Sequence, residues 1–353
     1  MAVVPPFPTR RPTGYDWLDD EPVFDPARHL QLEPPGATTS LAELGYSADE
    51  IAPTATPVAF SEPFRVLSDE GAEVLLEVAR RLRGHAVRAG DRIQNTVRGG
   101  CYRSAWLRDL CCSPELTGAM SDIYGTGVAP HTMPVHLGHL NYEPTEVGVA
   151  VDKWHHDTIP LDFVMMVSDP STLPGGRFEV FMGTRQEAAA LAAIGERPPI
   201  DRVLVPDFPG SGWAIALHGN MVVHRGAPLD SPAERITMVN AYVALDRSGD
   251  DQSRSRDLIG LDDPEVLYAD EKSIRFFSGL DGSEKFTSQA HSSYTILETP
   301  IVADVDGDNQ VEIVLGHCGD GYTSEHGAVT IYGDADQSWP RGRQIWNQHA
   351  YTI

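Results

Sequence analysis

The chain has 353 residues, of which 41% are hydrophobic, so it can hold more than one domain and a sizeable core. Its formal net charge is −24 at pH 7, which argues against nucleic-acid binding because that function needs a basic surface. No apolar run approaches the roughly 18 residues of a membrane-spanning helix, so we expect no membrane partner.

Residues 1–57 form a proline-rich segment with ten prolines and no sustained hydrophobic period. This composition predicts irregular structure that wraps around the core or forms a lid. The segment begins MAVVPPFPTRRP, without the apolar core of a secretory signal. The four cysteines are too few for a disulfide framework at this length, and both observations favour a cytoplasmic protein.

Two helical regions are predicted next. The first begins at Ser68 and ends at Gly84, and its apolar residues recur at helical spacing: Ala72, Leu75, Leu76, Ala79 and Leu82. The second covers about 104–124, and the segment 131–142 (HTMPVHLGHLNY) is expected to be extended.

Strands dominate residues 148–245, interrupted by one expected helix at 185–194. The run LDFVMMV at 161–167 predicts a buried strand, and GWAIAL at 212–217 predicts another. Helices followed by many short strands favour a β-sandwich with helices packed on one sheet, so the predicted fold class is mainly β with flanking helices.

Two histidines and one carboxylate form a candidate metal site. His155 and Asp157 are two positions apart, so on a strand both side chains point to the same face. His224 would complete the set, and this ligand set holds catalytic non-heme Fe(II) while leaving coordination positions open. His218 competes with His224, whereas His156 is expected to face away from its neighbours.

Arg235 follows His224 in the order of the chain, within the segment Glu234-Arg235-Ile236-Thr237. A buried arginine there could clamp the carboxylate of a co-substrate with two parallel hydrogen bonds. Thr237 lies on the same strand face and could add a hydroxyl hydrogen bond. The alternative for Arg235 is a surface salt bridge with Glu234.

The pattern His155-x-Asp157, His224, Arg235-x-Thr237 resembles that of the Fe(II)/2-oxoglutarate-dependent dioxygenases, most closely the phytanoyl-CoA dioxygenase-like branch. The resemblance covers about residues 60–250 and includes Gly175-Gly176 with the strand that follows. It implies a double-stranded β-helix, or jelly roll, at 58–250.

This resemblance also implies an activity. Fe(II) would be held by His155, Asp157 and His224, and 2-oxoglutarate by Arg235 and Thr237. With O2, the enzyme would oxidise a small-molecule substrate, most simply by hydroxylation, and release succinate and CO2. Asp157 argues against halogenation, because related halogenases replace this carboxylate with a small residue to admit halide.

Composition changes near residue 247, and 251–265 is the predicted linker. Beyond it, carboxylates alternate around a glycine and are followed by one more: Asp304, Asp306, Asp308 and Glu312. Hard cations such as Ca²⁺ take six to eight oxygen ligands, and apolar runs flank the loop, which favours a calcium loop between strands.

Residues 266–353 resemble FG-GAP/VCBS-type repeats, in stretches such as TPIVADVDGDNQVEIVLG. The resemblance implies a C-terminal β segment equivalent to one or two propeller blades, with a possible Ca²⁺ site. Such repeats usually occur in secreted or surface proteins, in contrast to the missing secretory signal.

Two other functions stay open. One is a metal oxygenase or isomerase of the cupin type that uses no 2-oxoglutarate, and succinate formation would discriminate it. The other is a calcium-binding surface or adhesion protein. The histidines of the segment 131–142 are expected in the core, the substrate pocket or the surface, and Asn141 and Tyr142 are candidates to line the pocket.

Overall fold

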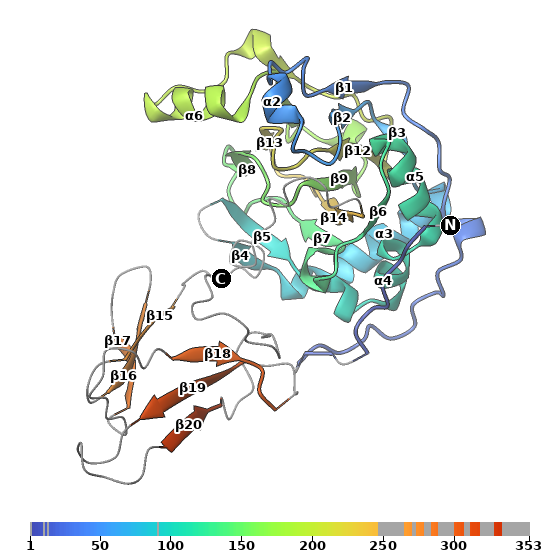
Figure 1. Ribbon diagram of the computed structural model, residues 1–353. Coiled ribbons are helices and arrows are strands. Elements are labelled where there is room, and N and C mark those ends of the chain that lie inside the picture. Colours follow the sequence, from blue (N-terminus) through green and yellow to red (C-terminus); the bar gives the residue numbers. More distant parts are fainter. Residues whose placement is uncertain are drawn as a thin grey trace. The chain divides into compact units, whose positions relative to one another are not determined.

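The structure is a computed structural model of the whole chain. Its described residues are 2–9, 11–12, 14–89, 92–245, 265–269, 273–278, 284–288, 300–306, 311–317 and 328–333. The chain divides into two compact units, Met1–Ile259 and Gly260–Ile353 (Figure 1). The predicted linker lies almost wholly outside the described residues, so the expected domain boundaries stay predictions.

The larger sheet of unit 1 is antiparallel and has ten described strands. Eight lie in the spatial order β1 (Thr38–Ser40), β2 (Val58–Ser61), β12 (Trp213–Leu217), β9 (Leu161–Met166), β14 (Thr237–Ala244), β7 (His139–Asn141), β5 (Ile93–Val97) and β4 (Val87–Ala89). The other two pair with β12 and β14 respectively: β3 (Phe64–Arg65) and β6 (Val128–Pro130). All residues of β9 are buried, as a central strand requires.

The smaller sheet of unit 1 has four described strands. Their order is β11 (Val203–Leu204), β10 (Phe178–Phe181), β13 (His224–Pro228) and β8 (Ala150–His155). From β8 to β14 the chain alternates between the smaller and the larger sheet, except that the consecutive strands β10 and β11 both lie in the smaller sheet. This alternation is consistent with the jelly roll expected from the sequence.

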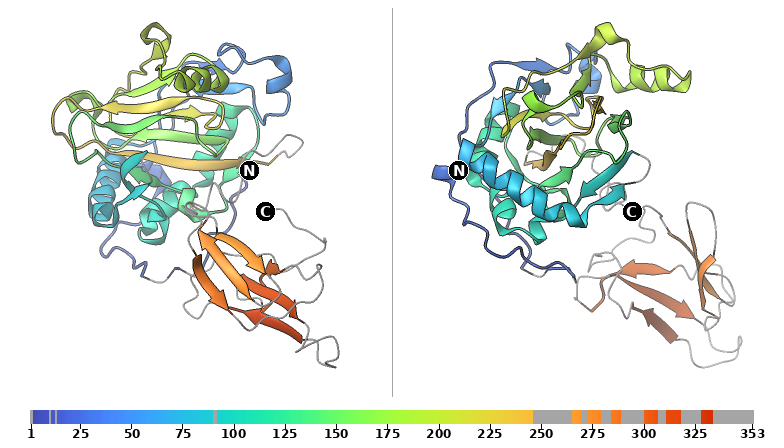
Figure 2. Two further views of the ribbon diagram at one scale, coloured as in Figure 1. Left: turned by 90° about the vertical axis from the view of Figure 1, so that its left-hand side faces the viewer. Right: turned by 180° about the vertical axis from the view of Figure 1, so that it is seen from behind.

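The side chains of β9 divide the core of unit 1 into two layers. Leu161, Phe163 and Met165 belong to the cluster that packs against the helices, whereas Val164 and Met166 pack toward the smaller sheet. The period of two therefore places a helix layer on one side of the large sheet and the small sheet on the other. Figure 2 shows α3 on the outside of the rolled sheets.

Three helices contribute to the helix layer: α3 (Asp69–Leu82), α4 (Ala105–Cys111) and α5 (Pro114–Tyr124). The helix predicted from Ser68 is α3, and the Ser68 side chain caps it by accepting a hydrogen bond from the Gly71 amide at 3.0 Å. The helix expected over 104–124 is two helices, because Ser113 and Pro114 begin a new one.

The remaining helices are short or lie at the surface. They are α1 (Pro26–His29), α2 (Ala48–Ile51), α6 (Arg185–Ala193), and the 3₁₀ helices η1 (Arg83–His85), η2 (Gly100–Tyr102), η3 (Pro134–His136), η4 (Pro170–Thr172) and η5 (Ile200–Arg202). The segment 131–142 is therefore only partly extended, because η3 interrupts it before β7. No helix in the described part of the chain is long and apolar enough to cross a membrane.

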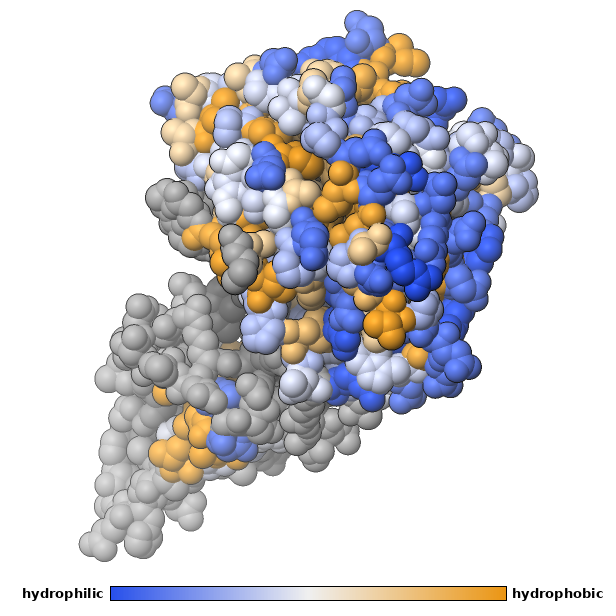
Figure 3. All heavy atoms as spheres, turned by 90° about the vertical axis from the view of Figure 1, so that its right-hand side faces the viewer, coloured by the Kyte–Doolittle hydropathy of each residue, from blue (hydrophilic) through white to orange (hydrophobic). Residues whose placement is uncertain are grey.

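The proline-rich segment 1–57 is not wholly irregular, since it supplies α1, α2 and the edge strand β1. Phe7, Leu18 and Phe24 from this segment pack against the helix-side cluster. Segment 1–57 therefore covers part of the core, which agrees with the expectation that it wraps around the core. On the face shown in Figure 3, hydrophobic side chains are scattered among hydrophilic ones, which is usual for a protein surface.

Unit 2 has two three-stranded antiparallel sheets among its described residues. The first contains β15 (Glu265–Ala269), β16 (Ile274–Ser278) and β17 (Glu284–Ser288), and the second β18 (Ile301–Ala303), β19 (Glu312–His317) and β20 (Ala328–Tyr332). Ile274, Ile313 and Leu315 form a small shared core. The unit is β-rich as expected, and its FG-GAP character stays a prediction.

Candidate metal centre

Neighbouring strands of the small sheet bring the three candidate ligands together. His155 at the end of β8 lies opposite His224 at the start of β13. Asp157 follows β8 and is held by a hydrogen bond from its amide to the Gly219 carbonyl at 2.7 Å. One carboxylate oxygen lies 3.4 Å from His155 Nε2, and the other lies 3.4 Å from His224 Nε2. One donor atom from each residue lies within 4.8 Å of the other two.

Backbone carbonyls orient both imidazole rings. The Nδ1 atom of His155 lies 2.6 Å from the Lys153 carbonyl, and that of His224 lies 3.1 Å from the Val222 carbonyl. Because a carbonyl only accepts hydrogen bonds, each Nδ1 carries the proton and each Nε2 keeps its lone pair. Both lone pairs are therefore available on the side where Asp157 lies, an arrangement that fits a divalent metal.

The protonation of the site also fits a metal. Burial, together with the nearby His155, lowers the pKa of His224 to about 3, so the ring is neutral at pH 7. Burial alone would raise the pKa of Asp157, but its contacts with His155 and His224 and the charge of Arg92 bring the pKa well below its usual range. Metal ligands must be deprotonated, and these two already are.

Arg235 lies in the same pocket and is almost fully buried. Its Nε donates to the Gly176 carbonyl at 2.8 Å and its Nη1 donates to Thr237 Oγ1 at 3.3 Å. Burial lowers its pKa to about 10, so the guanidinium remains charged at pH 7. No carboxylate among the described residues forms an ion pair with it, which leaves a buried cation suited to an anionic ligand.

Glu234 is not the partner of Arg235. It turns toward α3 and pairs with Arg80 at 2.6 Å and with Arg83 at 3.3 Å. The surface salt bridge considered for Arg235 is therefore wrong. Gly176 has a φ of +65°, and a Cβ there would lie 2.7 Å from Leu229 Cδ2, so the tight turn beneath Arg235 requires glycine.

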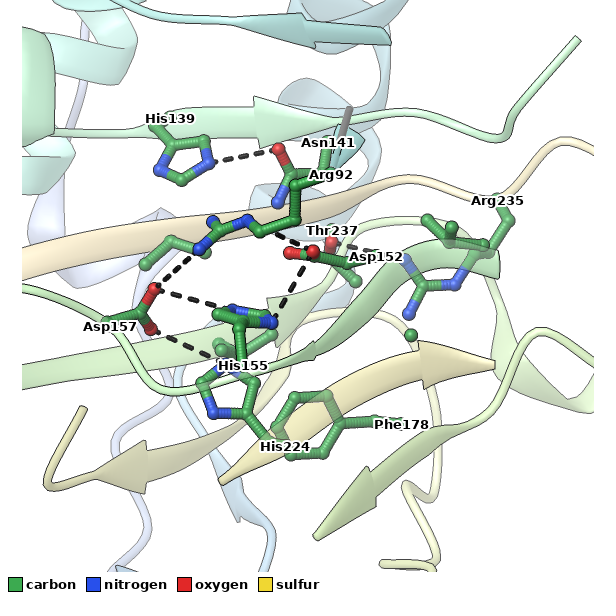
Figure 4. A pocket seen from close by; sticks show the side chains of 14 residues that line it. Arg92, His139, Asn141, Asp152, His155, Asp157, Phe178, His224, Arg235 and Thr237 are labelled. Carbon is green, nitrogen blue, oxygen red and sulfur yellow. Dashed lines mark hydrogen bonds and ion pairs between the residues drawn. The ribbon is translucent and has the colours of Figure 1, made fainter. Parts of the chain in front are cut away.

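A cavity of about 30 Å³ joins the candidate metal centre to Arg235. In Figure 4, His155, Asp157 and His224 lie on one side of it, and Arg235 with Thr237 lies on the other. Its walls come from both sheets and from the turn before β5, and the lining residues are Arg92, His139, Asn141, Val151, Asp152, His155, Asp157, Val164, Phe178, His224, Gly226, Arg235, Thr237 and Val239.

Sequence reasoning missed two charged residues of this pocket, Arg92 and Asp152. Arg92 Nε lies 3.1 Å from Asp152 Oδ1, and Arg92 Nη1 lies 3.8 Å from Asp157 Oδ1. Asp152 is three positions before His155, so a regular strand would place it on the opposite face. The register of β8 and β13 shifts between these positions, and the resulting bulge brings Asp152 Oδ1 to 3.4 Å from His155 Nδ1.

The competing histidines lie elsewhere. His156 is exposed, with its Nδ1 3.2 Å from the Asp157 carbonyl, and His218 is buried, with its Nδ1 3.1 Å from the Val58 carbonyl. Asn141 lines the pocket, whereas the Tyr142 hydroxyl donates to the Ala79 carbonyl at 2.7 Å in the helix-side core. His139 also lines the pocket, where its Nε2 lies 2.9 Å from Asn141 Oδ1.

The acidic loop of unit 2 forms a second cluster. Donor atoms of Asp304, Asp306 and Glu312 lie within 4.8 Å of one another, and Glu312 Oε2 also accepts a hydrogen bond from the Val305 amide at 2.9 Å. Asp308 lies outside the described residues. Calcium binding by this loop stays a prediction.

No known protein family and no curated protein matches this chain. Solved structures that match include the non-heme α-ketoglutarate-dependent epimerase SnoN from nogalamycin biosynthesis, with 18% identity over 58% of this chain and 83% of that chain, at a TM-score of 0.39. The carbocyclase SnoK from the same biosynthesis matches at 15% identity over 61% and 90%, with a TM-score of 0.41.

The protein EctD from S. alaskensis with bound Fe matches at 16% identity, over 68% of this chain and 94% of that chain, with a TM-score of 0.40. At these identities and TM-scores the neighbours do not identify the family or the reaction of this chain.

Proposed function

We propose that this chain is an Fe(II)- and 2-oxoglutarate-dependent oxygenase. The observation that carries the proposal is one pocket with two different binding ends. At one end, the Nε2 atoms of two imidazole rings and the Asp157 carboxylate converge. At the other, the charged and buried Arg235 faces the pocket without a carboxylate partner among the described residues. A metal fits the first end and the distal carboxylate of a keto diacid fits the second.

Each residue has a distinct task in this proposal. His155, Asp157 and His224 would hold Fe(II) on one face, and Arg235 with Thr237 would bind the far carboxylate of 2-oxoglutarate. The bound metal and co-substrate would supply the oxidation chemistry, with succinate and CO2 as products. The chain itself fixes the ligands, orients the co-substrate, and limits water around the buried Arg235.

The first test is an anaerobic titration with Fe(II) and 2-oxoglutarate, followed by the weak visible charge-transfer band expected of this chelate. We expect a saturable band in the native protein and none in Asp157→Ala, because a coordinating carboxylate is lost. His156→Ala is the matched control, since this neighbouring histidine is exposed and its Nδ1 lies 3.2 Å from the Asp157 backbone carbonyl. Binding of both ligands without a band in the native protein would overturn the proposal.

The second test concerns the co-substrate. Arg235→Gln should raise the apparent KM for 2-oxoglutarate by about tenfold or more, because a charge-assisted hydrogen bond is lost. Arg225→Gln serves as the control, because Arg225 pairs with Glu179 at 2.6 Å and does not line the pocket. An unchanged KM in Arg235→Gln would remove Arg235 from this role.

Succinate release distinguishes the proposed function from the main alternative. A metal oxygenase or isomerase of the cupin type would bind the metal but would release no succinate. Measurement of succinate in aerobic assays with 2-oxoglutarate therefore distinguishes the two classes. Whether the oxidation is a hydroxylation, a desaturation or a ring reaction depends on a substrate that binds beside the metal.

A further inference from the structure

Cationic and imidazole side chains gather on one side of the metal pocket. Arg92 precedes β5, Arg98 follows it, and His139 on the adjacent strand β7 lines the pocket together with Arg92. Burial lowers the pKa of His139, and the charges of Arg98 and Arg92 lower it further, as their proximity requires. In a chain with a net charge of −24, Arg92 places a positive charge beside the Asp152 and Asp157 carboxylates of this pocket.

The Arg92 guanidinium is only partly engaged by its neighbours. It lies 3.1 Å from Asp152 through Nε, and its Nη1 is 3.8 Å from Asp157, beyond hydrogen-bond distance. Among the described residues, neither terminal nitrogen of Arg92 makes a hydrogen bond. The side chain is about one third exposed, at 34%, so a ligand in the pocket can reach it.

Metal binding would loosen the contact of Arg92 with Asp157. In the proposed function the Asp157 carboxylate coordinates a divalent cation, which places a second positive charge near the Arg92 guanidinium. Asp152 then remains as its partner through Nε alone. The two terminal nitrogens form a planar fork that matches a carboxylate and can donate two parallel hydrogen bonds.

The position of Arg92 differs from that of Arg235. Figure 4 shows its guanidinium between His139 and Asp157, near the metal ligands and away from Arg235. The two arginines can therefore bind different anions. The carboxylates of Asp152 and Asp157 beside Arg92 disfavour a dianion such as a phosphate monoester and favour a group with a single negative charge.

We propose that Arg92 anchors a carboxylate of the substrate, so that this enzyme acts on organic acids. The inference rests on the proposed function, which makes this pocket the active site, but what it adds concerns binding by Arg92 alone. It assigns His139 and Asn141 to the wall beside the anchored group. The carbon to be oxidised would then lie close to the anchored carboxylate, beside the metal ligands.

The test compares acids with their amides by calorimetry on the protein loaded with Fe(II) and 2-oxoglutarate under anaerobic conditions. Suitable pairs are phenylacetate with phenylacetamide, hexanoate with hexanamide, and the acid and amide forms of N-acetyl amino acids. We expect several acids to bind and their amides to bind about tenfold or more weakly, because the charge-assisted hydrogen bonds are lost.

Variants assign this preference to Arg92. Arg92→Gln should remove the preference for acids, and Arg92→Lys should retain part of it, because the charge remains and the fork is lost. The double variant Arg92→Gln/Asp152→Asn removes the carboxylate left unpaired in the single variant. Arg28→Gln is the matched control. It removes the same charge, but from an arginine that pairs with Glu70 on the surface.

Three results would overturn the inference. The first is that no acid binds better than its amide to the native protein. The second is that the preference persists in Arg92→Gln and in the double variant. The third is that Arg92→Gln weakens the binding of 2-oxoglutarate and leaves the preference for acids unchanged, which would assign Arg92 to the co-substrate. Failure of the proposed function is distinguishable, because the visible band would then be missing whatever the acids do.

Discussion

At the scale of single residues, side-chain contacts decide what the pocket can bind. His155 and His224 each use Nδ1 to reach a backbone carbonyl two positions earlier in the chain. This leaves Nε2 as the donor atom of both rings, so the ligand geometry depends on the local backbone and not on other side chains. Arg235, by contrast, forms an ion pair with no carboxylate among the described residues, so its guanidinium can bind an anionic ligand that enters the pocket.

Asp162 is the most unusual residue of the core. It is fully buried on β9, and neither of its carboxylate oxygens has a hydrogen-bond partner among the described residues. Burial raises its pKa well above the usual range, and the charge of Asp157 raises it further. A Cβ at Gly219 would collide with its Oδ2, so this glycine leaves the space that the carboxyl occupies. Ionisation of the Asp162 carboxyl therefore lowers the stability of the folded state.

We predict that Asp162→Asn increases the free energy of unfolding at neutral pH by about 1–3 kcal/mol, the cost of an unsatisfied buried polar group. A raised pKa means that the folded state binds the proton more tightly, so stability falls as pH rises above the unfolded pKa of about 3.9. The gain from the substitution should therefore shrink toward pH 4.

Denaturant unfolding at pH 4 to 8 measures this effect, with the exposed Asp201→Asn as the control. A gain that does not change with pH, or a loss of stability at pH 7, would contradict the assignment of a buried ionisable cost to Asp162.

At the scale of elements, the pairing of β8 with β13 brings the candidate metal ligands His155 and His224 together. The bulge in β8 shifts the register so that Gly226 lies opposite Asp152 while His224 lies opposite His155. A Cβ at Gly226 would lie 3.0 Å from Val151 Cβ and 3.3 Å from the Asp152 amide nitrogen. The two strands therefore approach closely at a position where only glycine fits without displacement.

We predict that Gly226→Ala weakens metal binding by about tenfold, the lower range for changes that disturb the support of metal ligands. The added methyl group would push β8 from β13 and separate His155 from His224. Gly118→Ala in α5 is the control, because no atom lies within 4 Å of its added Cβ. That variant should keep its metal affinity and gain up to about 1 kcal/mol of stability from helix propensity.

Titration of both variants with Fe(II) under anaerobic conditions measures the metal affinity. Equal affinities in Gly226→Ala and in the native protein would show that the close approach of the two strands does not maintain the ligand geometry.

At the scale of the whole molecule, the two units have separate cores. The clusters of unit 1 draw on its helices, its two sheets and the segment 1–57, whereas the described core of unit 2 is a small cluster around Ile274, Ile313 and Leu315. The residues of the candidate metal pocket all belong to unit 1. The pocket therefore needs no described residue from unit 2.

We predict that residues 1–259 expressed alone fold cooperatively and bind Fe(II) and 2-oxoglutarate with affinities within about threefold of the full chain, because the core and pocket of unit 1 are retained. Thermal unfolding and the anaerobic titration measure both properties. A truncated chain that aggregates, or that folds but loses the metal, would show that unit 2 supports the centre. Addition of Ca²⁺ to the full chain tests the predicted loop independently.

The sequence by itself determined the local features of this protein. The apolar run at 161–167, the helical spacing after Ser68 and the separation of His155 from Asp157 are local features of the sequence. They allowed a strand-rich sandwich with flanking helices and the candidate ligands to be predicted, and the family resemblance specified the jelly roll. It missed the break at Pro114, where the competing start of a second helix prevailed over a continuous apolar pattern.

Only the tertiary structure decided which distant side chains share the pocket. The bulge in β8 reverses the expected facing of Asp152, and the turn before β5 brings Arg92 beside residues more than fifty positions later. Neither position has a periodic signal, because a bulge breaks the period and a turn has none. The pairing of Glu234 with α3 likewise depends on helix packing, and it is this pairing that leaves the buried charge of Arg235 for a ligand.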